Sequence, residues 1–371
     1  MPMVLSPLFD ISTPAVRHVR SAVDATTSLT SVTTTELSDE LRKIDHAYAA
    51  LAGLAIGDAL GMPTQSLSRE VIVKEFGELV TNFQPARSDH PYAAGLAAAT
   101  ITDDTEQALI LANELLRDDP AFDVFKYARE LLAWRDSARN RGLLDLLGPS
   151  TLVALHNIES GMDLLDTGRA GTTNGAAMRI TPVGIATSSA DLAALVERVG
   201  EVSAPTHNTS AAIGAAAAVA AVVSAGIDGA LVREAITVGL RAARIGEGYG
   251  EPTPPPTLSQ RLKEAVEIGN LLRGVELIDE VNTRIGTSLA SNESVPAAFA
   301  ILAAYRDHSW EACCVAASIG GDCDTIGALV GAMAGACGGS ASFPAWAIDI
   351  VETTNSLKLR TVSQRLFELR R

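Results

Sequence analysis

The sequence predicts an all-α protein. Hydrophobic residues make up 47% of the chain, but aromatic residues make up only 4%. Alanine and glycine dominate the apolar positions, and such small side chains favour closely packed helices over a sheet sandwich. Nearly every long segment repeats its apolar residues with the helical period, and no series of alternating strands with hairpin turns is recognisable.

The predicted helices begin near residue 38 and continue to the end of the chain. Ser38-Asp39-Glu40 has the composition of a helix start and leads into Leu41–Ile56. Residues 1–38 are rich in Ser and Thr with little periodicity, so we expect a flexible extension before a single domain over 39–371. Further helices are expected at Glu106–Leu116, Val124–Trp134, Asp191–Val199, Ser210–Ala225, Leu231–Ala243, Leu258–Leu272, Val295–Tyr305 and Trp310–Ser318.

Three segments need a choice between two interpretations. The apolar run Ala211–Ile227 is short, rich in alanine and without a basic flank, so we expect a buried core helix rather than a membrane span. The proline-rich stretch Glu251–Thr257 has helical sequence on both sides and is expected to be a surface loop within one domain. Gly327, Gly331 and Gly335 recur every four residues, which predicts a helix face that a neighbouring backbone approaches closely.

Charge and cysteine usage exclude several classes of protein. The formal charge of −15 argues against a nucleic-acid-binding surface, which normally carries a basic patch. The cysteines have no zinc spacing and indicate small buried residues in a reducing compartment. The first fifty residues do not have the pattern of a signal peptide. We therefore expect a cytoplasmic protein. The cysteines are Cys313, Cys314, Cys323 and Cys337.

Two acidic clusters stand before helix-like runs far apart in the chain. The first is Thr102-Asp103-Asp104-Thr105 and the second is Gly320-Gly321-Asp322-Cys323-Asp324-Thr325. Carboxylates and hydroxyls form an oxygen-only ligand set, which suits Mg²⁺ or Mn²⁺ better than zinc. Helix capping is the alternative for each cluster taken alone. Because capping does not require doubled aspartates at both places, metal ligation and a metal-dependent reaction are the favoured hypothesis.

Three further motifs could carry chemistry. Asp58 lies between Gly57 and Gly61, where it either orients other groups or forms a turn. The Thr172–Arg179 stretch suits the presentation of backbone amides to an anion or a sugar, or is an ordinary loop before a helix. His207 precedes a very apolar helix and is either a ligand-binding group or a structural histidine.

Taken in order, these five motifs resemble the ADP-ribosylglycohydrolase family, which includes the dinitrogenase-reductase-activating glycohydrolases. The resemblance covers about residues 46–340. It implies an all-α orthogonal bundle with a binuclear Mg²⁺ centre, in which Mn²⁺ can replace Mg²⁺. The implied reaction is hydrolysis of an N- or O-glycosidic bond at the anomeric ribose carbon of an ADP-ribosyl adduct. The implied substrate is either an ADP-ribosylated protein or a small molecule.

The resemblance also implies roles for individual residues. The implied metal ligands are Thr102, Asp103, Asp104, Asp322, Asp324 and Thr325. The residues expected along the substrate cleft are Asp58, Gln65, Asn174, Gly175, Met178 and His207. A carboxylate takes the proton of the attacking water while positive charge develops on the sugar ring, and Asp103, Asp322 and Asp324 are the candidates for this role.

Gln65 departs from the family pattern. Family members commonly carry a glutamate at this position, in a mobile loop over the substrate, and an amide cannot accept a proton as a base does. Either another acid such as Asp103 or Asp322 takes over, or the substrate is a free nucleoside or a small ribosyl metabolite. A third interpretation is a catalytically silent relative that binds ligand, against which the intact aspartates argue.

Overall fold

The computed structural model describes residues 34–117, 122–141 and 148–370. Every regular element in these ranges is a helix, which confirms the all-α prediction. Two isolated β-bridges join Thr173 to Ala290 and Thr209 to Glu251. Residues Glu40–Arg371 form one compact unit, and the Glu251–Thr257 stretch connects two helices within it.

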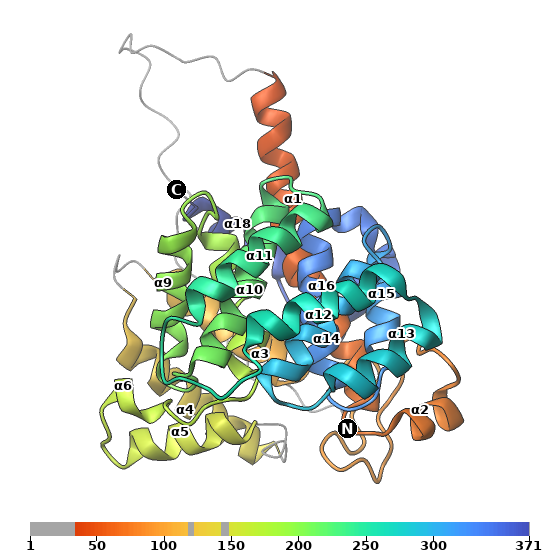
Figure 1. The fold of residues 1–371 in the computed structure, drawn as a ribbon, viewed down its shortest axis with the longest axis horizontal. Coiled ribbons are helices and arrows are strands. Elements are labelled where there is room, and N and C mark those ends of the chain that lie inside the picture. The colour runs from red at the N-terminus through yellow and green to blue at the C-terminus, as the bar shows by residue number, and fades with distance from the viewer. Residues whose placement is uncertain (1–33, 118–121, 142–147, 371) are drawn as a thin grey trace. The chain divides into compact units, whose positions relative to one another are not determined.

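The helices follow one another along the chain as coloured in Figure 1. The α-helices of the first half are α1 Thr34–Gly61, α2 Arg69–Phe76, α3 Asp103–Leu115, α4 Val124–Asn140, α5 Pro149–Glu159, α6 Leu164–Thr167, α7 Gly175–Met178, α8 Thr181–Ala186 and α9 Leu192–Ser203. Those of the second half are α10 Ser210–Ile227, α11 Val232–Gly246, α12 Leu258–Leu271, α13 Gly274–Glu280, α14 Ser291–Ala304, α15 Ser309–Ala316, α16 Cys323–Gly338, α17 Ala345–Thr354 and α18 Leu359–Glu368. Short 3₁₀ turns lie at Met62–Thr64 and Ser340–Ser342, and a π-helical turn lies at Val281–Ile285.

The first helix is longer than its sequence pattern predicts. It begins at Thr34 rather than near Ser38 and ends at Gly61 rather than at Ile56. Residues 1–33, which make up most of the predicted extension, lie outside the described residues, so the flexible extension stays a prediction. The end of α1 is apolar and buried, and it carries Asp58 into the interior.

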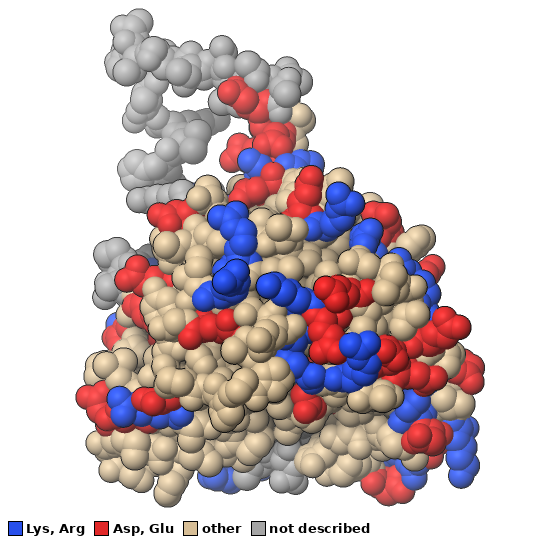
Figure 2. All heavy atoms as spheres, in the orientation of Figure 1, with Lys and Arg blue, Asp and Glu red and all other residues tan. Residues whose placement is uncertain are grey.

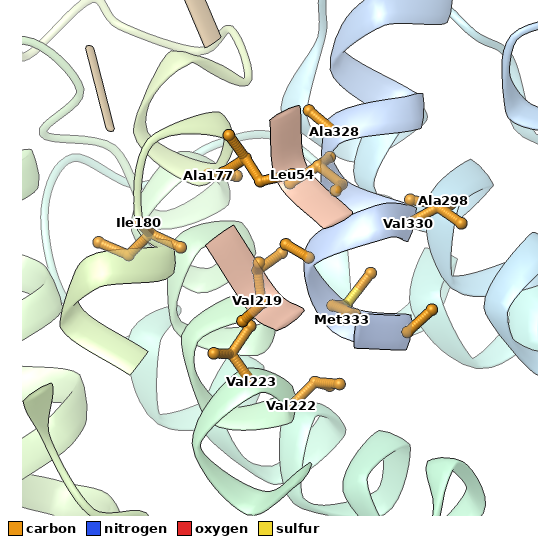
Figure 3. Close-up of a cluster of buried hydrophobic side chains, with 14 of the residues drawn as sticks. Leu54, Ala177, Ile180, Val219, Val222, Val223, Ala298, Ala328, Val330 and Met333 are labelled. Carbon is orange, nitrogen blue, oxygen red and sulfur yellow. The ribbon is translucent and has the colours of Figure 1, made fainter. Parts of the chain in front are cut away.

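Helix α10 lies at the centre of the fold. It packs against α7, α8, α9, α11 and α16, and its residues from Ala211 to Ile227 are all buried. Figure 3 shows side chains of α10 and α16, including Val219 and Met333, in one shared apolar core with Ile180. This helix is long and apolar enough to cross a membrane, but all of it is buried inside the fold. The prediction of a core helix is therefore confirmed.

Helices α1 and α16 touch through their backbones. A methyl group added at Gly57 would overlap the carbonyl of Gly327, and one added at Gly53 would overlap the carbonyl of Gly331. Gly335 meets the carbonyl of Ala49 in the same way. The predicted glycine face is thus a packing surface. It places Asp58 of α1 beside the first turn of α16.

The surface carries charges of both signs. Lysine and arginine side chains are interspersed with aspartate and glutamate on the face shown in Figure 2. All four cysteines are free, and Cys313, Cys314 and Cys323 are buried, as expected for small apolar residues of a core. That nucleic acid is not a partner stays a prediction.

Candidate functional site

The fold brings the two acidic clusters together. They stand at the first turns of α3 and α16, and these helices contact each other. The hydroxyl of Thr325 donates a hydrogen bond to Asp104 Oδ2 at 3.3 Å, and Thr102 donates to the same oxygen at 3.3 Å. All the predicted metal ligands are buried: Thr102, Asp103, Asp104, Asp322, Asp324 and Thr325.

Asp58 organises the start of α3. Its carboxylate accepts hydrogen bonds from the backbone N–H of Thr102 at 3.0 Å and from the hydroxyl of Thr102 at 2.7 Å. It also accepts from the backbone N–H and the hydroxyl of Thr105, at 3.2 and 2.5 Å. Because both oxygens of Asp58 are occupied, its observed role is to orient other groups. Its predicted contact with substrate stays a prediction.

Helix capping does not account for the two clusters. Thr102 and Asp322 are the N-cap residues of α3 and α16, and neither makes a side-chain capping hydrogen bond. Instead, several buried carboxylate oxygens have no hydrogen-bond partner. They are Asp104 Oδ1, Asp322 Oδ1, Asp324 Oδ1 and Asp324 Oδ2. Buried polar atoms are normally paired, so oxygens left over in one place indicate a missing partner.

The clustered carboxyls hold their protons unusually strongly. Burial raises the pKa of Asp322 to about 6, although the hydrogen bond from Asn174 opposes the shift. Burial, and after it the charges of neighbouring carboxylates, raise the pKa values of Asp103, Asp104 and Asp324 well above the usual range. A nearby cation would reverse these shifts, because it favours the ionised form.

The donor set fits a hard divalent cation. It consists of carboxylates and hydroxyls with unpartnered oxygens, which is the chemistry that Mg²⁺ and Mn²⁺ prefer. In the described part of the chain, no three His, Cys, Asp or Glu side chains stand close enough together to hold a metal ion as they are. The hydroxyls of Thr102 and Thr325 would join the aspartates in a ligand sphere.

Gln65 lies in a loop attached to the second cluster. Ser66 N–H donates to Gly321 O at 2.6 Å, and Gly321 N–H donates to Leu67 O at 3.0 Å. These two backbone hydrogen bonds tie the loop to the turn that precedes Asp322. The side chain of Gln65 is buried, and its Oε1 has no hydrogen-bond partner. The structure therefore places Gln65 next to the acidic site with a free acceptor.

Asn174 connects the third motif to the second cluster. Its amide nitrogen donates to Asp322 Oδ2 and to Ser294 Oγ, the latter at 2.9 Å. Asn174 therefore anchors one oxygen of Asp322 and leaves the other free. Met178 is buried at the far end of α7. The substrate contacts predicted for Asn174 and Met178 stay predictions.

His207 is packed against the start of α7. A methyl group at Gly175 would overlap the imidazole ring, so this glycine allows the close approach of the histidine. His207 Nε2 lies 3.0 Å from the hydroxyl of Thr173, and Nδ1 lies 2.8 Å from the hydroxyl of Thr206. The ring is fully buried, and burial lowers its pKa well below the usual range, with the charge of Arg179 acting in the same direction. His207 is therefore a neutral, firmly held ring.

Sequence reasoning assigned no role to several residues that join these motifs. Gln107, one helical turn after Asp103, donates to Asp103 Oδ2 at 3.0 Å. Arg179 is a fully buried arginine that contacts both Gln107 and Thr206. Signals existed, since a glutamine four residues after an aspartate lies on the same helix face and an arginine within an apolar run requires partners.

A small pocket borders the first cluster. Arg141 forms two hydrogen bonds to Glu106, at 2.8 and 2.7 Å, and the indole of Trp134 donates to Glu106 at 2.6 Å. This group forms the outer wall next to Asp103. The full lining is Ile101, Thr102, Asp103, Glu106, Trp134, Ala138 and Arg141.

Comparison with known proteins identifies the relatives of this chain. A family model described as ADP-ribosylglycohydrolase matches residues 39–371. The chain is 32% identical over 300 residues to an uncharacterized protein of Escherichia coli K12, YegU, covering 80% of this chain and 89% of that protein. It is 36% identical over 289 residues to an uncharacterized protein of Archaeoglobus fulgidus, covering 78% and 86%.

More distant relatives have a described activity or a solved structure. The ADP-ribosylarginine hydrolase Tri1 of Pseudomonas putida is 27% identical over 332 residues, covering 88% of this chain and 78% of that protein. A solved ADP-ribosylglycohydrolase-related protein complex superposes with a TM-score of 0.66 at 25% identity, covering 89% of this chain and 99% of the other. The helical architecture described above is therefore shared with a solved structure.

Proposed function

The chain belongs to the ADP-ribosylglycohydrolase family and is a glycosidic-bond hydrolase, and we propose that it cleaves an ADP-ribosyl adduct at the anomeric ribose carbon with Mg²⁺ as its metal. One observation carries this proposal. Four buried aspartates from two distant clusters meet, and three of them have oxygens without partners. The similarity to an ADP-ribosylarginine hydrolase supports an ADP-ribosyl substrate, either a small molecule or a modified protein. Mn²⁺ is the second candidate metal.

The proposed ligands are divided between the two clusters. Thr102, Asp103 and Asp104 come from the start of α3. Asp322, Asp324 and Thr325 come from the start of α16. A pair of divalent cations bound there would act as Lewis acids toward the ribose hydroxyls. They would also lower the pKa of a bound water. Asp324 suits ligation well, because neither of its oxygens has another partner.

Asp322 is our candidate for the proton acceptor. Asn174 anchors one of its oxygens, and the other has no partner. A base needs this combination of fixed orientation and a free lone pair. Asp103 is the alternative, since Gln107 anchors one of its oxygens in the same way.

The substrate is tested by product analysis. Purified protein with Mg²⁺ or with EDTA is incubated with ADP-ribosyl-arginine, ADP-ribosyl-serine and a panel of nucleosides, and the products are identified by mass spectrometry. We expect Mg²⁺-dependent release of free ADP-ribose. Release of a free base would instead support a nucleoside hydrolase, a second candidate favoured by Gln65 at the loop position. No product from any substrate, with metal binding retained, would indicate a silent ligand-binding relative.

The site is tested by removing its carboxylates. Asp104→Asn, alone or with Asp103→Asn, is expected to lose both Mg²⁺ binding and turnover. The matched control is Asp136→Asn, because Asp136 is an exposed carboxylate of α4 that pairs with Arg135 and Arg139. Full turnover in Asp104→Asn would show that the site is assigned wrongly.

We also propose a cytoplasmic location, supported by four cysteines that are all free.

A further inference from the structure

Arg179 is a buried cation that forms no ion pair with any described residue. Its side chain is 1% exposed and is the largest fully buried side chain of the described residues. No aspartate or glutamate in the described part of the chain forms a salt bridge with it. Burying a guanidinium is costly unless hydrogen bonds and opposite charge compensate it. Its partners are therefore informative, and they lead in two directions.

The first arm leads to Asp103. One guanidinium nitrogen of Arg179 donates to Gln107 Oε1 at 2.5 Å, and the amide nitrogen of Gln107 donates to Asp103 Oδ2 at 3.0 Å. An arginine can only donate, so it fixes which end of the Gln107 amide is oxygen. The nitrogen of that amide must then face Asp103. Arg179 thus sets the orientation of a carboxylate that the proposed function assigns to the metal centre.

The second arm leads to His207. The other terminal nitrogen of Arg179 donates to the hydroxyl of Thr206, and it also lies 3.4 Å from His207 Nδ1. The Thr206 hydrogen is then free to bond His207 Nδ1 at 2.8 Å, so Nδ1 is the acceptor of the ring. The ring proton must stay on Nε2, which lies 3.0 Å from the hydroxyl of Thr173. Burial lowers the pKa of His207, in agreement with one proton on the ring.

We propose that Arg179 is a positioning residue for two groups: it holds Asp103 of the proposed metal centre through Gln107, and it holds the neighbouring His207 in the Nε2–H tautomer through Thr206. The proposal rests on the proposed function and deepens it, because it gives a fully buried residue a role at the same site. One rigid cation ties α3, α7 and the segment before α10 to a single geometry.

The two arms can be cut separately. Gln107→Leu removes the arm to Asp103, and Thr206→Val removes the hydroxyl that connects Arg179 to His207; both substitutions nearly conserve side-chain volume. Arg179→Lys keeps the charge but loses the planar fork that serves both arms. The matched control is Arg135→Lys, which changes another buried arginine, one of α4 that is paired with Glu159 of α5.

Two measurements on the full chain, made without substrate, report separately on the two arms. Titration with Mg²⁺ by calorimetry reports the orientation of Asp103. Nitrogen–proton correlation spectra of histidine-labelled protein report the tautomer of His207. The chain has six histidines, and the signals of His207 are assigned as those that disappear in His207→Gln. We expect Gln107→Leu to weaken Mg²⁺ binding about tenfold, as loss of a group that supports a metal ligand does. Its His207 spectrum should be unchanged.

The reciprocal result is expected of the second arm. Thr206→Val should change the His207 tautomer pattern and leave Mg²⁺ affinity within about twofold, a difference of roughly 0.4 kcal/mol. Arg179→Lys should change both readouts, and Arg135→Lys neither. An Arg179→Lys variant that folds and retains both wild-type readouts overturns the proposal, as does a Thr206→Val variant with an unchanged His207 spectrum. Because neither readout needs turnover, a failure of the proposed substrate would leave this test intact.

Discussion

Thr325 Oγ1 donates a hydrogen bond to Asp104 Oδ2 across 3.3 Å, and the two residues are 221 positions apart in the chain. This contact shows that the two acidic clusters form one site. It leaves Asp104 Oδ1 without a partner, and both oxygens of Asp324, in the other cluster, are equally unpartnered. Packing of α3 against α16 thus gathers like charges at a cost to folding. That cost is what a bound cation would remove.

Substitutions at Asp324 and Asp58 are expected to have opposite effects on the metal-free protein. Asp324→Asn removes a repelled, unpartnered carboxylate, so the melting temperature in EDTA should rise. Asp58→Asn loses the acceptor for Thr102 and Thr105 and should lower the free energy of unfolding by about 3 kcal/mol. Calorimetry or fluorescence melting checks both. If Asp324→Asn melts earlier than wild type in EDTA, the unpartnered aspartate is not a source of strain.

Removal of metal is expected to make stability depend on pH. Burial raises the pKa of Asp58 and of Asp322 from 3.8 to about 6. Between these values the metal-free folded protein binds more protons than the unfolded chain, so the contribution of these groups to the free energy of unfolding falls as pH rises from 4 to 6. Saturating Mg²⁺ should remove this loss of stability, because the metal binds the carboxylates in their ionised form.

Melting curves from pH 4.5 to 7.5, with EDTA and with Mg²⁺, measure this effect. The quantity to compare is the stabilisation by Mg²⁺, which should increase with pH. The lowered pKa of His207 makes the free energy of unfolding change with pH in the opposite sense. Asp324→Asn is the control, because it keeps His207, so that this contribution cancels when the variant is compared with the wild type. A Mg²⁺ stabilisation that is constant with pH would contradict the raised pKa values.

The contact between α1 and α16 is expected to tolerate no side chain. Gly57→Ala would press a methyl group against the carbonyl of Gly327 and should destabilise the protein by about 3 kcal/mol. It should also weaken Mg²⁺ binding, because Asp58 follows directly in the chain. Gly200→Ala is the matched control. Gly200 lies in helix α9, and a methyl group there would come no closer than 3.5 Å to its nearest neighbour, the ring of Tyr249. This control should be neutral or stabilising by about 0.5 kcal/mol.

Gln65→Glu tests whether the loop residue decides the substrate. The new carboxylate would be buried beside the second cluster, so the protein should melt earlier in EDTA and recover with Mg²⁺. If the wild type uses a different substrate from its relatives, turnover of ADP-ribosyl-arginine should rise at least tenfold. Gln65→Leu is the control, because leucine approximates the size of the glutamine side chain but has no polar group. Equal turnover by all three proteins would exclude a role of position 65 in catalysis.

Composition and periodicity were sufficient to predict the helical class, the core helix α10 and the glycine contact of α16. These features are local, because each depends on residue types repeated at a fixed spacing within one segment. The same is true of the two acidic clusters, each of which is a run of a few residues. The boundaries of α1 were predicted less well: the helix begins at Thr34 and continues to Gly61, where its last residues are buried.

The connections within the site were not predictable from spacing. Spacing left open whether Asp58 orients other groups or forms a turn. In the fold it holds the first turn of α3, because the packing of α1 against α16 brings it there. Arg179 was part of a quoted motif but had no role until its partners Gln107 and Thr206 were seen, 72 and 27 positions away. The chain by itself specifies which oxygens and nitrogens exist. Which of them meet depends on helix packing, because contacts between distant segments follow from how whole surfaces fit and not from any local pattern.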